Sequence, residues 1–194
     1  MIMNKPANTS HHAKNILLTG RPRVGKSTII KKVVEKLCTA GYKSIAGFYT
    51  AEIIRDNKRV GFSINTLDGR IGRLAEVGFE SPYRLGKYGI DMKSFEAVAL
   101  TSLEHAIKTN SLIVIDEIGY MELKSKRFRE LVIKALDSPA FVLAAIMRNK
   151  FDFADIIKAR NDVEVITIRT DNRNRLTDEI AARFSTLFRN SAII

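Results

Sequence analysis

The fold of this chain is decided by a short stretch, GRPRVGKS, at residues 20–27. It fits the pattern G-x-x-x-x-G-K-[ST], in which the backbone N–H groups of a loop surround phosphate oxygens. The pattern has this meaning only between a strand and a helix. Here a short apolar run precedes it at residues 15–19, and apolar residues at helical spacing follow at residues 26–38. The context therefore predicts a strand, a phosphate-binding loop and a helix.

The functional groups of this stretch have separate expected roles. Lys26 reaches the β- and γ-phosphates, Ser27 offers its hydroxyl to Mg²⁺, and the amino terminus of the helix adds partial positive charge. Arg23 stands at the fourth loop position, where many such loops have Gly or Asn. A positive φ at that position would cost an arginine roughly 1 kcal/mol. The nucleotide-binding residues expected here are Gly20, Arg21, Pro22, Arg23, Val24, Gly25, Lys26, Ser27 and Thr28.

A second apolar strand, expected at residues 112–115, runs into two neighbouring acids, Asp116 and Glu117. An acid at the end of a strand is the usual partner of the metal at a phosphate loop. We therefore expect Asp116 to act, through water, on the Mg²⁺ bound by Ser27. Neighbouring side chains at a strand end diverge, so Glu117 is expected to face the γ-phosphate and polarise an attacking water. Lys26 and Glu117 are thus the predicted catalytic residues.

The remaining sequence alternates strands and helices, which predicts an α/β domain over residues 15–194 with a mostly parallel sheet. An antiparallel hairpin, residues 51–55 and 60–67 around the polar turn Asp56-Asn57-Lys58, is expected within or beside that sheet. Residues 70–91 are rich in glycine and predict loops and short strands. Further strands are expected at residues 44–49, 141–147 and 163–168, and further helices at residues 93–108, 124–136, 152–158 and 175–188.

Composition narrows the class of protein. Of 194 residues, 45% are hydrophobic, which is enough for a core, yet no apolar run reaches the roughly 18 residues that cross a bilayer. Residues 1–14 read as a flexible polar tail without the apolar centre of a secretion signal. The one cysteine, Cys38, is expected on the apolar side of its helix and excludes an internal disulfide. We therefore expect a cytoplasmic protein with no membrane partner.

The net charge of +11 favours polyanionic partners. Nucleoside triphosphates are one such class and nucleic acid is another, which leaves a nucleic-acid-binding ATPase open. The basic residues are dispersed along the chain and form no single block, so charge alone does not establish nucleic-acid binding. The oligomeric state does not follow from the sequence.

Two other enzyme classes share parts of this pattern. Residues 116–119 match D-x-x-G and residues 149–152, Asn-Lys-Phe-Asp, match N-K-x-D, the pair of motifs typical of a GTP-specific GTPase. A kinase acting on a small molecule or on nucleic acid uses the same phosphate loop. It would need an acceptor pocket or a lid, for which residues 70–91 offer room.

Several residues outside the two motifs are candidates for contacts with the nucleotide. Arg148 and Arg173 could each add positive charge in the transition state. Residues that end the strand at 44–49, or follow it, could approach the phosphates or stack on a base. These are Phe48, Tyr49, Thr50 and Glu52.

In the order of its motifs the chain resembles a family of small P-loop nucleoside-triphosphatases first described from thermophiles, which has a human relative called the cancer-related nucleoside-triphosphatase. The specific motifs are G-F-Y-T at residues 47–50, D-E-I-G-x-M-E-L at 116–123 and N-R-N at 172–174. The resemblance implies a RecA-like three-layer α/β/α core. It implies slow, Mg²⁺-dependent hydrolysis of ATP, GTP, CTP and UTP to diphosphate and phosphate. It also implies nucleotide contacts from Asp116, Glu117, Ile118 and Gly119.

Overall fold

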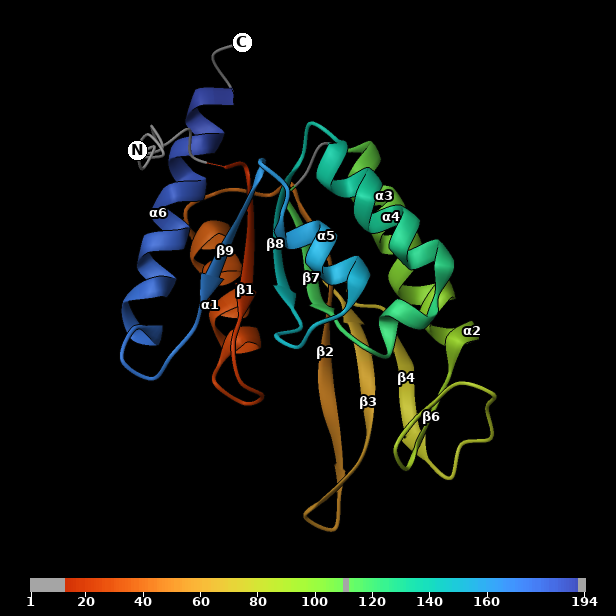
Figure 1. The fold of residues 1–194 in the computed structure, drawn as a ribbon. Helices are drawn as coiled ribbons and strands as arrows, with labels where there is room; N and C mark the ends of the chain where they lie inside the picture. The colour runs from red at the N-terminus through yellow and green to blue at the C-terminus, as the bar shows by residue number, and fades with distance from the viewer. Residues whose placement is uncertain (1–12, 110–111, 192–194) are drawn as a thin grey trace, which may run out of the picture.

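The computed structural model describes residues 13–109 and 112–191, so most of the expected tail at residues 1–14 lies outside the described residues. Within those ranges the strands form one nine-stranded sheet with helices on both faces (Figure 1). In spatial order its strands are β5 (Arg84–Leu85), β6 (Tyr88–Ile90), β4 (Ile71–Val77), β3 (Lys58–Thr66), β2 (Ile45–Arg55), β7 (Leu112–Ile118), β8 (Phe141–Ile146), β1 (Asn15–Thr19) and β9 (Val163–Thr167).

Five consecutive strands of this order are parallel to one another: β2, β7, β8, β1 and β9. β1 is buried at every position, and β7 and β8 at nearly every position, which explains why they read as continuous apolar runs. Parallel strands end at one edge of a sheet, so the segments that follow β1, β7, β8 and β9 meet there. The α/β fold predicted from the sequence is confirmed.

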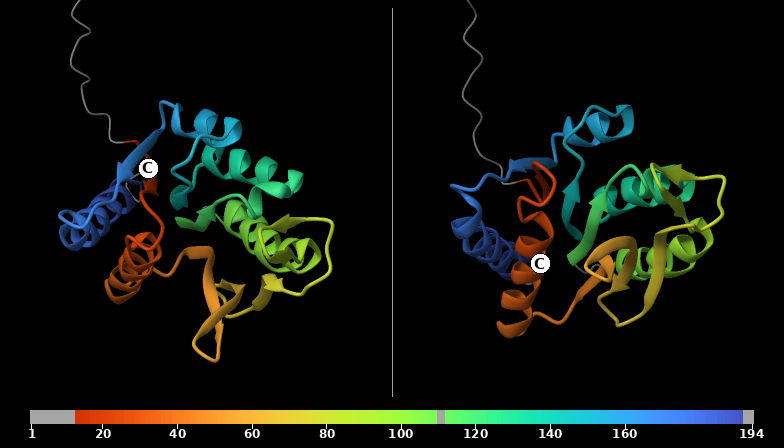
Figure 2. Two further views of the ribbon diagram at one scale, coloured as in Figure 1. Left: turned by 60° about the horizontal axis from the view of Figure 1, so that its bottom comes forward. Right: turned by 90° about the horizontal axis from the view of Figure 1, so that it is seen from below.

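Helices α1 (Lys26–Thr39) and α6 (Arg173–Ser191) cover one face of the sheet, and α3 (Thr101–Lys108), α4 (Lys126–Asp137) and α5 (Asp152–Lys158) cover the other (Figures 1 and 2). Each face has its own hydrophobic core. Along β1, Ile16 and Leu18 pack in the core of the α1–α6 layer, whereas Leu17 packs in the opposite core. The buried side chains of α1 recur at helical spacing: Ile29, Ile30, Val33, Val34 and Leu37.

Two helices differ in detail from their predicted bounds. The segment expected at residues 93–108 consists of α2 (Met92–Phe95), a π-helical stretch (Glu96–Leu100) and α3. The segment expected at residues 124–136 begins as a 3₁₀ turn (Glu122–Lys124), and α4 starts only at Lys126. Ser125 sets that start, since its hydroxyl accepts a hydrogen bond from the Phe128 amide at 3.1 Å.

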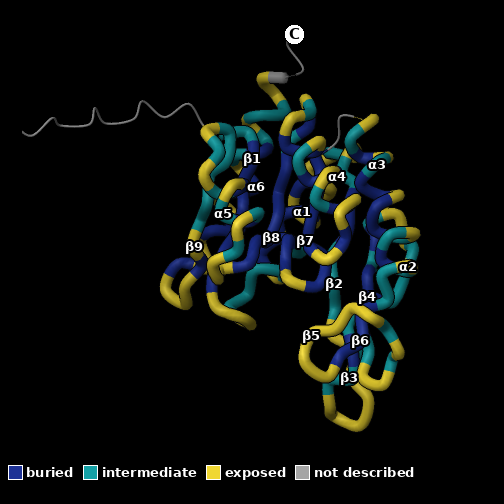
Figure 3. The backbone as a smooth tube through the Cα atoms, turned by 45° about the vertical axis from the view of Figure 1, so that its right-hand side comes forward, coloured by how far each residue is buried: buried dark blue, intermediate teal, exposed yellow. Residues whose placement is uncertain are grey.

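The predicted hairpin is present, but β2 continues through Thr50 without the expected break. Residues 45–49 of β2 pair with β7, and the rest pair with β3 alone, so the hairpin projects beyond the carboxyl edge of the parallel strands (Figure 1). Its tip is exposed (Figure 3). Asp56 and Asn57 form the turn with φ of 50° and 58°, which these residues tolerate. Residues 70–91 then add β4, β6 and β5 beside β3, so they extend the sheet sideways on its antiparallel side.

One expectation about burial is wrong. Cys38 is exposed, because the apolar side of α1 runs through Val34 and Leu37 and Cys38 lies one position beyond it. Among the described residues, no helix combines the length and apolar character that crossing a membrane requires.

Gly47 allows β2 to pair closely with β7. Its φ is 127°, and a Cβ atom there would lie 2.0 Å from the carbonyl oxygen of Val114. The carbonyl oxygen of Gly47 accepts hydrogen bonds from the Ser102 hydroxyl at 3.0 Å and from the Leu67 amide at 2.9 Å. The backbone around Gly47 is therefore fixed from several sides.

We expect Gly47→Ala to lower the free energy of unfolding by about 3 kcal/mol or more, because the backbone of β7 cannot move away from the added methyl group. Gly41→Ala is the matched control, since Gly41 has a φ of 92° but open space around it. That change should cost about 1–2 kcal/mol. Denaturant unfolding of the two variants measures the difference. Equal losses would show that the positive φ alone, and not the contact with Val114, requires the glycine.

Candidate functional site

The predicted phosphate loop joins β1 to α1 at the carboxyl edge of the parallel strands. β1 ends at Thr19 and α1 begins at Lys26, as the motif predicts. Arg23 has a φ of 61°, so the positive φ considered from the sequence is present. Gly25 precedes α1 in a left-handed conformation, and no described side chain caps the helix. The first amides of α1 are therefore available to an anion.

Lys26 and Glu117 meet at the centre of this site. The Nζ atom of Lys26 lies 3.5 Å from Oε2 of Glu117. The lysine side chain is only 11% exposed and the glutamate side chain 35%. Because β8 lies between β1 and β7 in the sheet, this contact brings together two segments that are not hydrogen-bonded neighbours. The structure thus places the two predicted catalytic side chains against each other.

Asp116 lies beneath this pair. It is 1% exposed, and its carboxylate is hydrogen-bonded to the Ser27 side chain. Burial raises the pKa of Asp116 to about 6; the hydrogen bond to Ser27 opposes this rise, and the charge of Glu117 adds to it. The hydrogen bond brings the two predicted metal partners, Ser27 and Asp116, into contact. The peptide bond that joins Asp116 to Glu117 is cis.

The oxygen atoms of Ser27 and Asp116 suit a hard cation such as Mg²⁺. The Oδ2 atom of Asp116 is buried without a hydrogen-bond partner in the structure, which is consistent with a ligand that it would contact. Within residues 13–109 and 112–191, no group of three or more His, Cys, Asp or Glu side chains is placed to hold a metal ion.

The other predicted nucleotide-binding residues differ in their surroundings. Residues 20–28 form the loop and the first turn of α1, and Thr28 is exposed there. Gly20 packs tightly against the chain after β9, because a Cβ atom there would lie 2.8 Å from the carbonyl oxygen of Ile168. Ile118 is fully buried within the core, so its side chain is not a nucleotide contact.

A cavity of about 370 Å³, which we call the hairpin-side cavity, opens beside Lys26 and Glu117. Ser27 also lines it, and Thr50 and Glu52 do so from β2. The sequence places these last two residues near the phosphates, and the structure brings them to the same cavity as Lys26. The cavity has room for a terminal phosphate and for groups that react with it.

Two arginines reach the hairpin-side cavity and are joined by one carboxylate. Arg59 on β3 donates from Nη1 to Oε1 of Glu52 at 2.6 Å and from Nε to the Tyr88 hydroxyl at 3.1 Å. Arg23 on the loop donates to the same Glu52 oxygen at 3.4 Å. The hydrogen bond from Arg59 is the largest cause of the lowered pKa of Glu52. Arg59 is thus held in a fixed orientation beside the phosphate loop.

The arginines singled out from the sequence lie elsewhere. Arg148 lines a cavity of about 380 Å³ beside Gly20 and Arg21, and Arg173 lines a groove between α1 and α6. Neither lines the hairpin-side cavity. Sequence reasoning missed Arg59, because its place beside the loop depends on how far β2 and β3 extend past the sheet edge.

The aromatic residues considered for stacking on a base, and the N-K-x-D residues typical of a GTPase, also lie apart from the phosphate loop. Phe48 is fully buried and packs against Phe95 and Phe128, so it belongs to the core. Tyr49 contacts Lys31, whose Nζ lies 4.0 Å from the ring centroid. Residues 149–152 follow β8 and begin α5, and they line none of the three cavities that border the phosphate loop in the described chain.

Glu122, like Arg59, is a residue at this site that sequence reasoning did not select for a role. It is 4% exposed and lies close to Glu117: a Cβ atom at Gly119 would be 2.8 Å from a Glu117 oxygen and 2.9 Å from a Glu122 oxygen. Burial, together with the charges of Glu117 and Asp116, raises the pKa of Glu122 to about 8. Both carboxyl groups therefore lie against Gly119.

Comparison with known proteins gives consistent matches along the chain. The sequence model of a protein family described as NTPase matches residues 15–181. The nucleoside-triphosphatase THEP1 of Thermotoga sp. (strain RQ2) is 49% identical over 165 residues, which cover 85% of this chain and 92% of that protein. The matched segments include both the phosphate loop and the acidic end of β7.

Two solved structures are similar over most of their length. The crystal structure of THEP1 from the hyperthermophile Aquifex aeolicus matches with a TM-score of 0.77 and 34% identity, covering 86% of this chain and 96% of that one. The solution structure of a human cancer-related nucleoside triphosphatase matches with a TM-score of 0.78 and 36% identity, covering 89% and 97%.

The burial of Glu122 has a measurable consequence for stability. Its pKa is about 8 in the folded chain against an ordinary value of 4.5, so the folded state holds a proton that the unfolded state has lost between these two values. The stabilising contribution of this proton is complete below about pH 4.5, falls as pH rises and is lost above about pH 8. Glu122→Gln keeps a neutral side chain at every pH.

We therefore expect Glu122→Gln to raise the melting temperature relative to wild type at about pH 9 and to give a smaller gain, or none, at about pH 5. Thermal unfolding without nucleotide or metal measures both differences. Glu130 is exposed and pairs with Lys126 on the surface of α4, so Glu130→Gln is the control. Its difference in melting temperature from wild type should depend little on pH. A Glu122→Gln difference that is the same at both pH values would contradict the burial argument.

Proposed function

The chain belongs to the nucleoside-triphosphatase family that these matches define, so its activity is the hydrolysis of nucleoside triphosphates, and we propose how its site carries out that reaction. The contact of 3.5 Å between Lys26 and Glu117 carries the proposal. It supports a role for Lys26 as the cation that meets the terminal phosphates and for Glu117 as the carboxylate that acts on water. Both groups lie at the end of a loop whose amides are suited to phosphate oxygens.

We propose that residues 20–28 hold the triphosphate. The loop amides and the amino terminus of α1 meet the phosphate oxygens, and Lys26 neutralises charge on the β- and γ-phosphates. In the structure Lys26 pairs with Glu117. When the γ-phosphate is present, the ammonium group contacts it instead, while Glu117 stays close to the phosphorus atom.

Membership of the family implies a divalent metal cofactor, and we propose that it is Mg²⁺. Ser27 and Asp116 would hold it, Asp116 through water, because their oxygens are in contact and Oδ2 of Asp116 is buried without a partner. When bound, Mg²⁺ neutralises charge on the β- and γ-phosphate oxygens.

Glu117 is proposed to orient the attacking water and to accept its proton. The water oxygen forms a bond to the γ-phosphorus in line with the bond that breaks, which joins this phosphorus to the bridging oxygen of the β-phosphate. The diphosphate is the leaving group. Arg59, held by Glu52 and Tyr88 at the hairpin-side cavity, supplies positive charge to the phosphoryl group as it transfers.

We propose that ATP, GTP, CTP and UTP are all substrates. The N-K-x-D residues, 149–152, do not line the cavities beside the phosphate loop, which argues against specific recognition of a guanine base by this motif. We also place the protein in the cytoplasm, since an exposed lone thiol, Cys38, suits a reducing compartment.

Glu117→Gln should lower kcat for phosphate release by about 100-fold or more while nucleotide affinity stays near wild type, because the amide cannot accept the proton of water. Lys26→Ala should weaken nucleotide binding itself. Phosphate release from ATP, GTP, CTP and UTP, with binding measured separately, tests both variants. Glu130→Gln, on the exposed side of α4, is the control. Full activity in Glu117→Gln would contradict the proposed role of this carboxylate.

The same assay separates hydrolysis from the alternatives. With small hydroxyl compounds or nucleic acid present, phosphate release should still equal diphosphate formation. An excess of diphosphate over free phosphate would reveal transfer to an acceptor. Turnover of GTP alone would contradict the broad substrate range.

Arg59→Ala should lower kcat by about 100-fold or more with a smaller change in KM, because its charge acts mainly on the transferring group. Arg55→Ala is the matched control: Arg55 lies on the same hairpin but pairs with Glu76 at 2.8 Å. Steady-state kinetics of both variants, with melting temperatures to verify folding, provides the measurement. Equal kcat values for the two variants would rule out this role for Arg59.

A further inference from the structure

The triphosphate has a direction on the phosphate loop. In the proposed function its terminal end lies at the hairpin-side cavity, where Lys26 and Glu117 are found. In such loops the amides surround the α- and β-phosphates and the lysine reaches the β- and γ-phosphates. The α-phosphate and the nucleoside attached to it therefore leave the loop on the side away from Glu117. Thr28, which follows Ser27 and is exposed, lies on that path.

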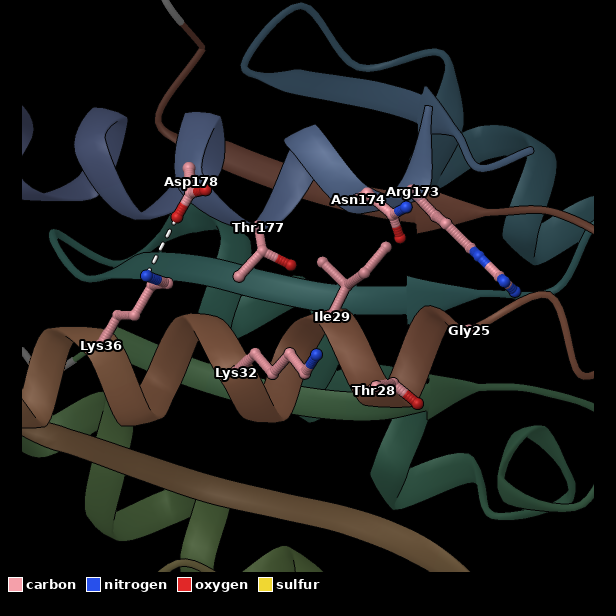
Figure 4. A pocket seen from close by; sticks show the side chains of 9 residues that line it. All are labelled: Gly25, Thr28, Ile29, Lys32, Lys36, Arg173, Asn174, Thr177 and Asp178. Carbon is pink, nitrogen blue, oxygen red and sulfur yellow. Dashed lines mark ion pairs between the residues drawn. The ribbon is translucent and has the colours of Figure 1, made fainter. Parts of the chain in front are cut away.

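A groove between α1 and α6 begins at this point. It has a volume of about 500 Å³, within the range of small-molecule sites, and it starts at Gly25 and Thr28. Figure 4 shows Arg173 and Asn174 projecting from the first turn of α6 near the loop, with Lys32 and Thr177 further along the groove. The groove is thus continuous with the phosphate loop and lined from two helices.

An ion pair crosses the far end of the groove, and one apolar side chain lies at its base. Lys36 on α1 pairs with Asp178 on α6 at 3.0 Å, which bridges the helices one turn beyond Lys32 (Figure 4). Ile29 lines the floor and is 3% exposed. The space between the loop and the Lys36–Asp178 pair is therefore limited, with polar groups at its walls and an apolar surface beneath.

We propose that this groove holds the ribose and the base of the nucleotide, an inference that rests on the proposed function. The Arg173 guanidinium is planar and can lie over the face of a base. The side chains of Lys32, Asn174 and Thr28 can hydrogen-bond to ribose hydroxyls and to base edges.

The chemistry of the groove also explains broad base tolerance. Arg173, Asn174 and Lys32 are exposed side chains that can adjust their donors and acceptors to different bases. The lining residues include no aromatic side chain, so no fixed stacking slot selects a purine over a pyrimidine. The cavity beside Gly20, Arg21 and Arg148 borders the start of the loop, away from Thr28, and is the less suitable place for the nucleoside.

Inorganic tripolyphosphate tests this assignment, because it has the phosphates of the substrate without the nucleoside. Asn174→Trp, which fills the groove without changing charge, and Arg173→Ala should each weaken binding of ATP and UTP about tenfold or more relative to binding of tripolyphosphate. Arg175→Ala is the control, since Arg175 lies on the same turn of α6 but pairs with Glu179 at 3.3 Å. It should leave both affinities unchanged.

The outcomes of this experiment are distinguishable. Unchanged affinity for ATP and UTP in both groove variants, or equal loss of tripolyphosphate binding, would overturn the groove assignment while leaving the phosphate loop intact. Failure of tripolyphosphate to bind wild type, or equal binding to Lys26→Ala, would instead refute the proposed function and the inference with it. Photolabelling with 8-azido-ATP should mark residues of α1 or α6, and labelling confined to the Arg148 cavity would overturn the assignment.

Discussion

The contact between Lys26 and Glu117 depends on one constraint, the common edge at which parallel strands end. β1 and β7 are separated by β8, yet both run in the same direction, so the segments after them meet over the end of β8. The mostly apolar strands β1, β7 and β8 stabilise that arrangement because they are buried on both faces. Lys26 then extends from the first turn of α1 to a carboxylate on a strand with which β1 shares no hydrogen bonds. The proposed phosphate-binding loop and the proposed catalytic carboxylate come together because the sheet has this topology.

The surroundings of the loop give the site two distinct sides. On one side β2 and β3 pass beyond the sheet edge, and Glu52 joins Arg59 of the hairpin to Arg23 of the loop. On the other side α1 and α6 begin together and leave a groove between them. The first side concentrates charge where a phosphoryl group would transfer, and the second offers an adaptable polar surface. A substrate with three phosphates and a variable base needs both features, the concentrated charge for its phosphates and the adaptable surface for its base.

The parts of this site that could be predicted from sequence are those set by local pattern. The bounds of β1 and the start of α1 follow from the apolar run and the glycine-lysine motif. From the sequence, a positive φ at Arg23 is only a condition to consider, and the structure shows that it is present. Arg59 and Glu122 could not be found in this way. The first depends on strand pairing beyond the sheet edge and the second on burial against Glu117, which are properties of the packed chain. Cys38 shows that local pattern can also fail within one helix, because it is exposed although its neighbour along α1, Leu37, is buried.

The most direct test of the account is a crystal structure of the protein with Mg²⁺ and a non-hydrolysable nucleoside triphosphate. We expect the phosphates on the amides of residues 20–28, the metal at Ser27 and Asp116, and the Glu117 carboxylate hydrogen-bonded to a water in line with the γ-phosphorus. An empty loop, or a Glu117 side chain turned away from the γ-phosphorus while the nucleotide is bound, would contradict it.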